Sequence, residues 1–298
     1  HVRSRRQRQM CIRDRNIILK DQLTQNDIDH LIKKWDLDPT IFTYPNSSIE
    51  VARFIPIDSN KLKNGHLLVS FDLLSNDLPI EQELIPIFTI FDQNHLFIGT
   101  TRSLSELKPQ ENIIETIFQS LCIQIKHLHA ELVTIKQKID HLDQAARRTT
   151  KTKELKKVTD LTRQLVYLKH TLDDQTPSLE EFGNYLVENK LANQARVKSI
   201  MTKQKRITKM IHVYTDLLNS ISGLFTAMMD SHLNHLMKYL DSAALVIALP
   251  ALISGIWGMN VGGLPGKENE NGFWILIIFV SLLTIGWGIF LKSKKYND

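Results

Sequence analysis

Ser242–Gly258 reads SAALVIALPALISGIWG and Phe273–Leu291 reads FWILIIFVSLLTIGWGIFL. Neither stretch contains a charged residue, and each is close to the length that crosses about 30 Å of hydrocarbon as a helix. Only residues 259–272 lie between them. We therefore expect 242–258 and 273–291 to form a hairpin of two transmembrane helices joined by an outer loop at 259–272.

The charges around the two stretches predict their orientation. Lys238 precedes the first stretch, Lys292, Lys294 and Lys295 follow the second, and the loop holds only Lys267. Cytoplasmic flanks carry the excess of basic residues, so we expect a multi-pass protein of the cytoplasmic (inner) membrane with both termini in the cytoplasm. The tail 292–298 would then be a basic cytosolic segment. A simple two-span anchor explains the same charges.

The first stretch and the residues before it carry a stripe of small or polar side chains. The stripe recurs at steps of three, four and seven residues, at Asn234, Met237, Asp241, Ala244, Ala248, Ala251, Gly255 and Gly258. Small side chains allow close packing of membrane helices. The same stripe, repeated in several copies of the helix, would line a pore that admits a hydrated ion. The second stretch is bulky and apolar on nearly all sides, as expected for a helix that faces lipid.

Asp241 favours the pore interpretation. An ionisable residue at the edge of a span usually faces a bundle interior or water, and a ring of carboxylates concentrates cations at a pore. The alternative is an interfacial aspartate that extends toward the headgroups.

Long helices precede the spans. Apolar residues spaced by threes and fours predict one helix from about residue 106, a second that Pro177 ends, and a third that continues into the membrane. We expect an antiparallel hairpin at 106–176 and a stalk helix at 178–241; one helix from Leu186 to Gly258 would extend roughly 110 Å. The hairpin stripe comprises Ile114, Ile117, Leu121, Ile125, Leu128, Leu132, Ile135, Ile139 and Leu142, then Leu155, Val158, Leu165, Leu168 and Leu172. A stalk that runs from cytosol into a bilayer needs such a helix, whereas a compact domain does not.

Residues 16–105 predict an α+β cytosolic domain. Strands are expected at 48–55, 66–71, 85–91 and 95–100, the last two as a hairpin. The segment 1–15 (HVRSRRQRQMCIRDR) is interpreted as non-native adaptor-derived sequence and is excluded, so the native N-terminus is expected to be missing. Outside it, 31 basic residues face 31 acidic ones, although the whole chain has net charge +5. With Cys11 inside the excluded segment and Cys122 alone outside it, no disulfide framework or cysteine-based metal site is expected.

One short set of motifs resembles the CorA family of divalent-cation channels. Asn234-His-Leu-Met237-Lys238-Tyr-Leu240 matches the family's N-x-x-M-K-x-L, and Pro250, Gly255 and Gly258-Met259-Asn260 match its later proline and G-x-x-G-M-N at the outer end of the first span. The match is specific over the last sixty-five residues and faint over the α+β part.

The resemblance implies a homopentamer with five copies of the first span around the pore, the second span as an outer ring, and the cytosolic part as a funnel. Gly258, Met259 and Asn260 would form the selectivity filter, holding the hydrated ion through its waters, which suits Mg²⁺. Met237 and Leu240 would form a hydrophobic gate, with Asn234 as a polar ring beside it, and Asp241, Ala244, Ala248, Ala251 and Gly255 would line the rest of the pore. Transport would follow the membrane potential and stop when cytosolic Mg²⁺ is high.

Departures from the family pattern leave the identity of the transported ion undecided. Asp241 stands where the family usually has threonine, and Trp257 where it has tyrosine or phenylalanine. Val261-Gly262-Gly263-Leu264-Pro265 resembles the loop of the zinc-transporting ZntB branch, so Zn²⁺, Co²⁺ or Ni²⁺ are alternatives to Mg²⁺. Glu268 and Glu270 could draw cations to the outer mouth or simply be solvated. His232 and His235, one turn apart, could bind a metal, although such pairs are usually unremarkable.

Other functional classes have less support in the sequence. No nucleophile–base pair or phosphate-binding loop is present, so we do not expect an enzyme or a resident cofactor. The expected partners are further copies of the chain, lipid and divalent cations, without nucleic acid. A membrane-anchored coiled-coil scaffold explains the helices, but it leaves Asp241, the small stripe and Gly258-Met259-Asn260 unexplained.

Overall fold

The computed structural model describes residues 8–12, 15–42, 50–73, 84–101, 104, 106–110, 112–147, 152–259, 261–262 and 271–293. These residues form two compact units, His1–Leu224 and Phe225–Asp298. The first unit combines a mixed sheet with long helices. The second holds the last part of α5 (Gln194–Trp257) and α6 (Gly272–Ser293). This architecture confirms the expected α+β domain, helical hairpin and two apolar C-terminal helices.

The described part of the first unit contains a six-stranded sheet of order β1-β2-β6-β5-β4-β3. Its strands are β1 (Arg8–Ile12), β2 (Arg15–Lys20), β3 (Arg53–Ile57), β4 (Gly65–Leu73), β5 (Leu84–Phe91) and β6 (His95–Thr100). β2 and β6 are parallel, and the other neighbours are antiparallel. The last three strands confirm the sequence prediction, and β3 begins later than expected. β1 lies within the segment that was excluded, where no strand was expected.

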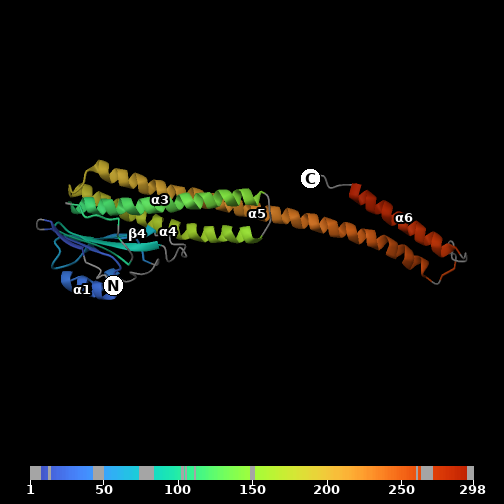
Figure 1. Ribbon diagram of the computed structural model, residues 1–298, viewed down its shortest axis with the longest axis horizontal. Helices are drawn as coiled ribbons and strands as arrows, with labels where there is room; N and C mark the ends of the chain where they lie inside the picture. Colours follow the sequence, from blue (N-terminus) through green and yellow to red (C-terminus); the bar gives the residue numbers. More distant parts are fainter. Residues whose placement is uncertain are drawn as a thin grey trace, which may run out of the picture. The chain divides into compact units, whose positions relative to one another are not determined.

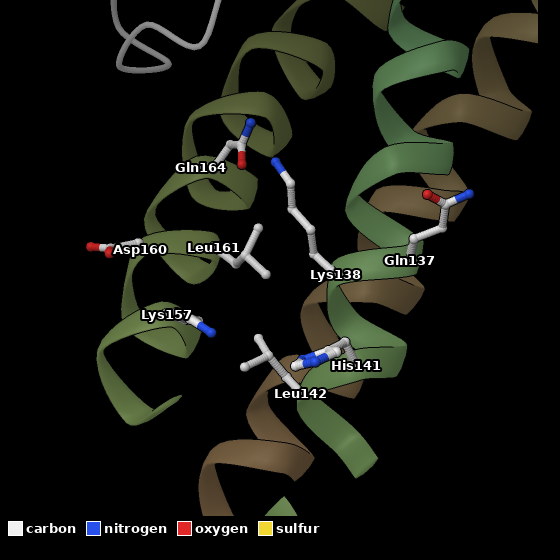
Figure 2. Close-up of a pocket in the computed structure, with 8 residues that line it drawn as sticks. All are labelled: Gln137, Lys138, His141, Leu142, Lys157, Asp160, Leu161 and Gln164. Atoms are coloured by element: carbon white, nitrogen blue, oxygen red, sulfur yellow. The ribbon is translucent and has the colours of Figure 1, made fainter. Parts of the chain in front are cut away.

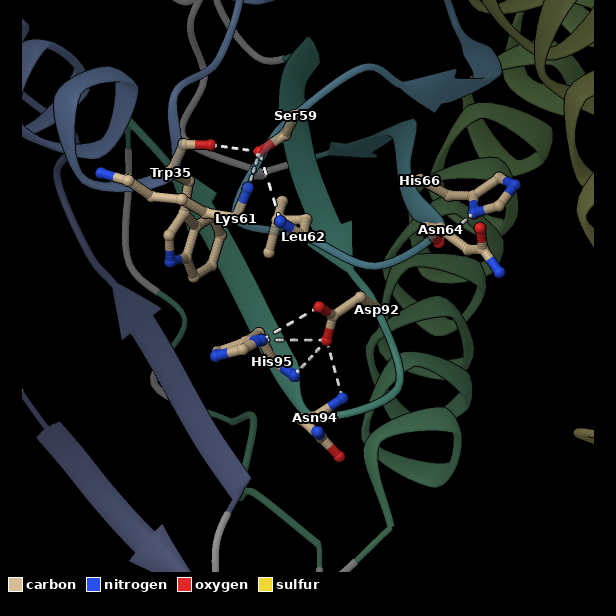
Figure 3. Close-up of polar contacts among 9 residues, drawn as sticks. All are labelled: Trp35, Ser59, Lys61, Leu62, Asn64, His66, Asp92, Asn94 and His95. Carbon is tan, nitrogen blue, oxygen red and sulfur yellow. Dashed lines mark hydrogen bonds and ion pairs between the residues drawn. The ribbon is translucent and has the colours of Figure 1, made fainter.

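Asp92 organises the turn of the predicted hairpin between β5 and β6. Its carboxylate accepts hydrogen bonds from the backbone N–H groups of Asn94 at 2.7 Å and His95 at 2.6 Å, and Nδ1 of His95 lies 3.0 Å from the other carboxylate oxygen (Figure 3). A side chain that satisfies the turn's backbone donors is the usual role of aspartate in such loops. The turn therefore fixes the register in which Phe91 pairs with Leu96.

Helices cover the two faces of the sheet (Figure 1). α1 (Gln25–Trp35) places Ile28, Leu31 and Trp35 in one core with residues of β4, β5 and β6. On the other face, α4 (Thr152–Glu188) meets the sheet, where Phe182 lies edge-on to Phe91 at 5.8 Å between ring centroids. α1 was not foreseen, although Thr24 and Asp27 form a capping box at its start.

The long helices bury the predicted stripes. In α3 (Ile113–Ala146) every stripe residue from Ile114 to Leu142 is at most 8% exposed. In α4 and α5 the same spacing buries Val158, Leu165, Leu168, Leu172, Ile200, Ile207, Ile211 and Leu218. The apolar repeat of threes and fours thus reports the faces by which these helices pack.

The expectation that Pro177 ends the second helix is wrong, because α4 continues to Glu188. Proline removes the backbone donor that would bond the carbonyl of Asp173, and the hydroxyl groups beside it donate to the two neighbouring carbonyls instead. Thr176 donates to the carbonyl of Leu172 at 2.8 Å, and Ser178 to that of Asp174 at 3.1 Å. Burial of Leu172, Leu179 and Phe182 then holds the helix together across the proline.

The stalk helix correspondingly begins at Gln194 rather than at residue 178. α4 stops where Lys190 takes a left-handed conformation with φ 58°, and the N–H of Leu191 donates to the carbonyl of Leu186 at 2.8 Å. Asn193 then caps α5, since its side chain accepts a hydrogen bond from the N–H of Ala195 at 3.0 Å. The turn between α4 and α5 is set by these backbone contacts.

Candidate functional site

The end of α5 presents the predicted small and polar stripe on one exposed face. Asn234, Asp241, Ala244, Ala248, Ala251, Gly255 and Gly258 are all exposed in the single chain. Met237 and Leu240, the expected gate residues, are 60% and 64% exposed. None of the described residues of the second unit covers these side chains. The stripe is therefore available to another copy of the chain or to an ion path.

The opposite face of the same segment is half-buried. Its half-buried positions are Ser242, Ala243, Val246, Leu249, Pro250, Ile253 and Trp257, again spaced by threes and fours. α6 carries a matching half-buried seam at Leu276, Val280, Leu283 and Thr284. Within this unit the two seams identify the faces by which the hairpin packs. The half-buried face carries both small and bulky side chains, and Leu245, Ile247, Leu252 and Ile256 are exposed on the flanks of the small stripe.

Both helices are long and apolar enough to cross a membrane. Their most apolar windows have mean hydropathy 1.8 in α5 and 2.2 in α6. α6 begins beside Phe273 and Trp274, whose rings lie 5.7 Å apart at the end of the span, where aromatic side chains favour an interface. The helical extents agree with the expected spans at 242–258 and 273–291.

The expected filter lies at the C-terminal end of α5. The N–H of Gly258 donates to the carbonyl of Ser254 at 2.9 Å, and that of Met259 to the carbonyl of Ile256 at 3.2 Å, so the helical pattern closes at these residues. A Cβ at position 258 would lie 3.2 Å from the Ser254 carbonyl oxygen, which is a tight contact. The end of a helix carries partial negative charge and favours a cation. Asn260 lies outside the described residues, as do Glu268 and Glu270.

His232 and His235 are both exposed on α5. On a helix they lie more than a quarter turn from the stripe that contains Asn234. Among the residues that the structure describes, no three histidine, cysteine, aspartate or glutamate side chains are grouped to hold a metal ion. The histidine pair by itself thus supplies two ligands at most.

Sequence reasoning missed one cluster of titratable side chains in the first unit. Nδ1 of His127 on α3 lies 2.8 Å from the carboxylate of Asp72 on β4, and its Nε2 lies 3.6 Å from Glu106. The Asp72 hydrogen bond raises the pKa of His127, against the opposing effect of its partial burial. Each imidazole nitrogen faces a carboxylate, so the cluster is an ion-pair clamp between sheet and helix. Residues 55 positions apart give no local signal of it.

A groove with a volume of about 610 Å³ lies between α3 and α4 near the tip of the hairpin. Leu142 and Leu161 form its floor, and the side chains of Lys138 and Gln164 point toward one another across it (Figure 2). The remaining lining residues are Gln137, His141, Lys157 and Asp160. These residues include no nucleophile–base pair, and Lys157 is already paired with Glu154 at 3.0 Å.

Comparison with known proteins places this geometry in one family. The family described as CorA-like Mg2+ transporter protein matches residues 20–294. The cobalt/magnesium transport protein CorA of Thermotoga maritima is 20% identical over 87% of this chain and 72% of its own length. That of Methanocaldococcus jannaschii is 30% identical over 30% of this chain, which spans only 28% of that protein.

Two further matches concern the fold of the chain and the ion that its relatives transport. The zinc transport protein ZntB of Photorhabdus laumondii is 32% identical over 26% of this chain and 23% of its own length. The complete structure of the CorA magnesium transporter from Methanocaldococcus jannaschii superimposes with a TM-score of 0.77, covering 95% of this chain and 92% of that one at 16% identity. At that identity the structural match establishes the fold.

Proposed function

The chain belongs to the family of CorA-like Mg²⁺ transporters, which are membrane proteins that carry divalent cations, and from this premise we propose that it forms a channel for Mg²⁺. Several copies, five by resemblance to the family, would place the exposed stripe of α5 around a common axis. α6 would then lie outside, on the half-buried side of α5. Both termini would lie in the cytoplasm.

One observation carries the proposal: the small and polar stripe is exposed on the face of α5 opposite the half-buried one. A lone anchor has no need of two faces that differ in this way. Asp241 at the membrane edge and the alanines and glycines above it leave room for an ion that keeps its water shell. Mg²⁺ dehydrates reluctantly and suits such a path.

The outer end of α5 supplies the proposed filter. Helix ends bearing partial negative charge would converge there from every copy, and Gly258 offers backbone carbonyls without a side chain. We assign Asn260 the role of holding the ion's water through its amide, with Met259 beside it. Glu268 and Glu270 would add negative charge at the outer mouth.

The inner constriction would lie at Met237 and Leu240. Both are large, apolar and exposed in the single chain, so in an assembly they would meet their counterparts around the axis. A ring of such side chains stops ions by excluding water. Asn234, one turn before Met237, would present a polar ring beside the gate.

A zinc transporter is the second candidate, and the match to ZntB proteins together with His232 and His235 favours it. An uptake assay in proteoliposomes that hold the purified protein distinguishes the two candidate functions. Uptake of Mg²⁺ and of Zn²⁺ is measured in the presence and in the absence of a proton gradient. Mg²⁺ uptake independent of the gradient supports the channel. Zinc uptake that needs the gradient, with little Mg²⁺ uptake, contradicts it and supports the second candidate.

A further inference from the structure

The first part of α5 is strongly basic. Between Glu188 and Asp216 the chain contains seven lysine or arginine residues and no acidic one, namely Lys190, Arg196, Lys198, Lys203, Lys205, Arg206 and Lys209. Two of them are ion-paired within the chain, Arg196 with Glu115 at 3.1 Å and Lys205 with Glu180 at 2.6 Å. Lys198, Lys203, Arg206 and Lys209 are exposed.

Two of these exposed cations lie in register with the proposed pore residues. Counted back along the sequence in steps of seven, Arg206 stands four steps before Asn234, and Lys209 four steps before Met237. Every position of this double series is exposed: Thr202, Arg206, Lys209, Val213, Asp216, Ser220, Gly223, Ala227, Asp230, Asn234 and Met237. A seven-residue repeat keeps one seam of a helix toward a common axis.

Three acidic groups lie near this part of the seam. Glu180 is paired with Lys205, and Asp173 lies 3.3 Å from His212. Asp216 follows Lys209 by seven residues, which is about 10 Å of helix rise and comparable to the screening length in physiological salt. In a symmetric assembly the same face of every copy meets at the axis. Arg206 and Lys209 of every copy would therefore face one another at the axis, with Asp216 one heptad further along, and an anion with several charged oxygens bridges cations that converge in this way.

We propose that Arg206 and Lys209 form a binding site for a small multivalent phosphate anion, of the triphosphate kind, at the cytosolic end of the ion path. The inference rests on the proposed assembly around the α5 seam. The guanidinium fork of arginine matches phosphate oxygens in pairs, and lysine adds point charge. One polyanion satisfies several converging cations at once, whereas monovalent anions would have to be gathered singly.

The test is calorimetric titration of the full-length protein in detergent and metal-free buffer, with inorganic triphosphate in one arm and ATP in the other. We expect binding that weakens as salt is added. The double variant Arg206→Glu/Lys209→Glu should lose at least about tenfold in affinity, because opposite charges then line the seam. The matched control Lys153→Glu/Lys156→Glu reverses two exposed lysines on α4 and should bind as the parent does.

Equal binding of triphosphate and ATP shows that the phosphate chain is what is recognised, and tighter binding of ATP adds contacts to the nucleoside; both support the site. No binding of either, or equal loss in the control variant, overturns it. Assembly mass and Mg²⁺ flux are measured on the same samples. A sample that assembles and passes Mg²⁺ but binds neither anion contradicts this inference alone. A sample that neither assembles nor passes ions contradicts the proposed function as well.

Discussion

Gly183 on α4 faces Val197 on α5 so closely that alanine does not fit. A Cβ at position 183 would lie 2.6 Å from Cγ1 of Val197, well inside ordinary van der Waals contact. Overpacking of this kind costs about 1–3 kcal/mol, and replacing a helical glycine by alanine returns about 1 kcal/mol of helix propensity. The valine side chain has few alternative rotamers in a helix. We expect Gly183→Ala to destabilise the chain by about 1 kcal/mol, the difference between these effects.

Thermal unfolding of the purified protein, followed by circular dichroism, measures the effect. A loss of about 1 kcal/mol corresponds to a melting temperature lower by about 2–4 °C in a unit of this size. Gly286→Ala on α6, outside the α5 seam, is the matched control, because nothing lies within 4 Å of its Cβ position. That variant should melt at or above the parent temperature, since only the gain in helix propensity remains.

The pair Gly183→Ala/Val197→Ala separates the clash from other causes. Removing the valine methyl groups gives the new Cβ its space, so the double variant should be more stable than the sum of the two single changes predicts. For residues in contact the interaction free energy falls in the range of about 0.5–3 kcal/mol. Additive single effects, or a Gly183→Ala variant that melts above the parent, would refute the close contact between α4 and α5.

Three further changes test local contacts, each by melting temperature. Asp72→Asn removes the group that raises the pKa of His127 above its ordinary 6.5. The stability that this ion pair contributes is complete below pH 6.5 and is lost as the pH rises through the raised pKa, so the difference in melting temperature between variant and parent should shrink from about pH 6 to pH 9. A difference that stays constant over this range contradicts the ion pair. Lys190→Gly relieves the cost of a left-handed backbone at φ 58° and should stabilise the folded chain by about 0.5–1 kcal/mol. A lower melting temperature would contradict the left-handed conformation at this position. Pro177→Ala restores a backbone donor to α4 and should raise the melting temperature; a drop would show that proline's rigidity matters more.

Much of the fold follows from periodicity alone. The stripe from Ile114 to Leu142 is buried as its spacing predicts, and the turn at Asp92 follows from local hydrogen bonds. Pro177 misled the prediction because the tertiary burial of Leu172, Leu179 and Phe182 outweighs one missing backbone donor. The start of the stalk helix was missed because the left-handed position that ends α4 is occupied by Lys190, where a glycine would have marked the helix end in the sequence. The available cue was Asn193, whose side chain caps α5.

The candidate site stays a prediction. Its residues share one helix, so spacing alone places Asn234, Met237 and Asp241 on one face. All three are exposed, but so is every residue from Met229 to Asp241, so exposure does not distinguish them. The Asp72–His127 clamp joins residues from two distant elements, and no local pattern could have indicated it. The assembly that the seam implies depends on contacts between copies, which a single chain does not contain.

The central claim is tested most directly by Mg²⁺ flux through proteoliposomes that hold either the parent protein or Asn260→Ala, with assembly mass confirmed for both. We predict that Asn260→Ala lowers the flux by about tenfold or more, equivalent to at least about 1.4 kcal/mol, because the ion's water shell loses its amide ring. Asn219→Ala, an exposed asparagine on α5 outside the seam, should leave the flux unchanged. Unchanged flux in an intact Asn260→Ala assembly would contradict the assigned filter.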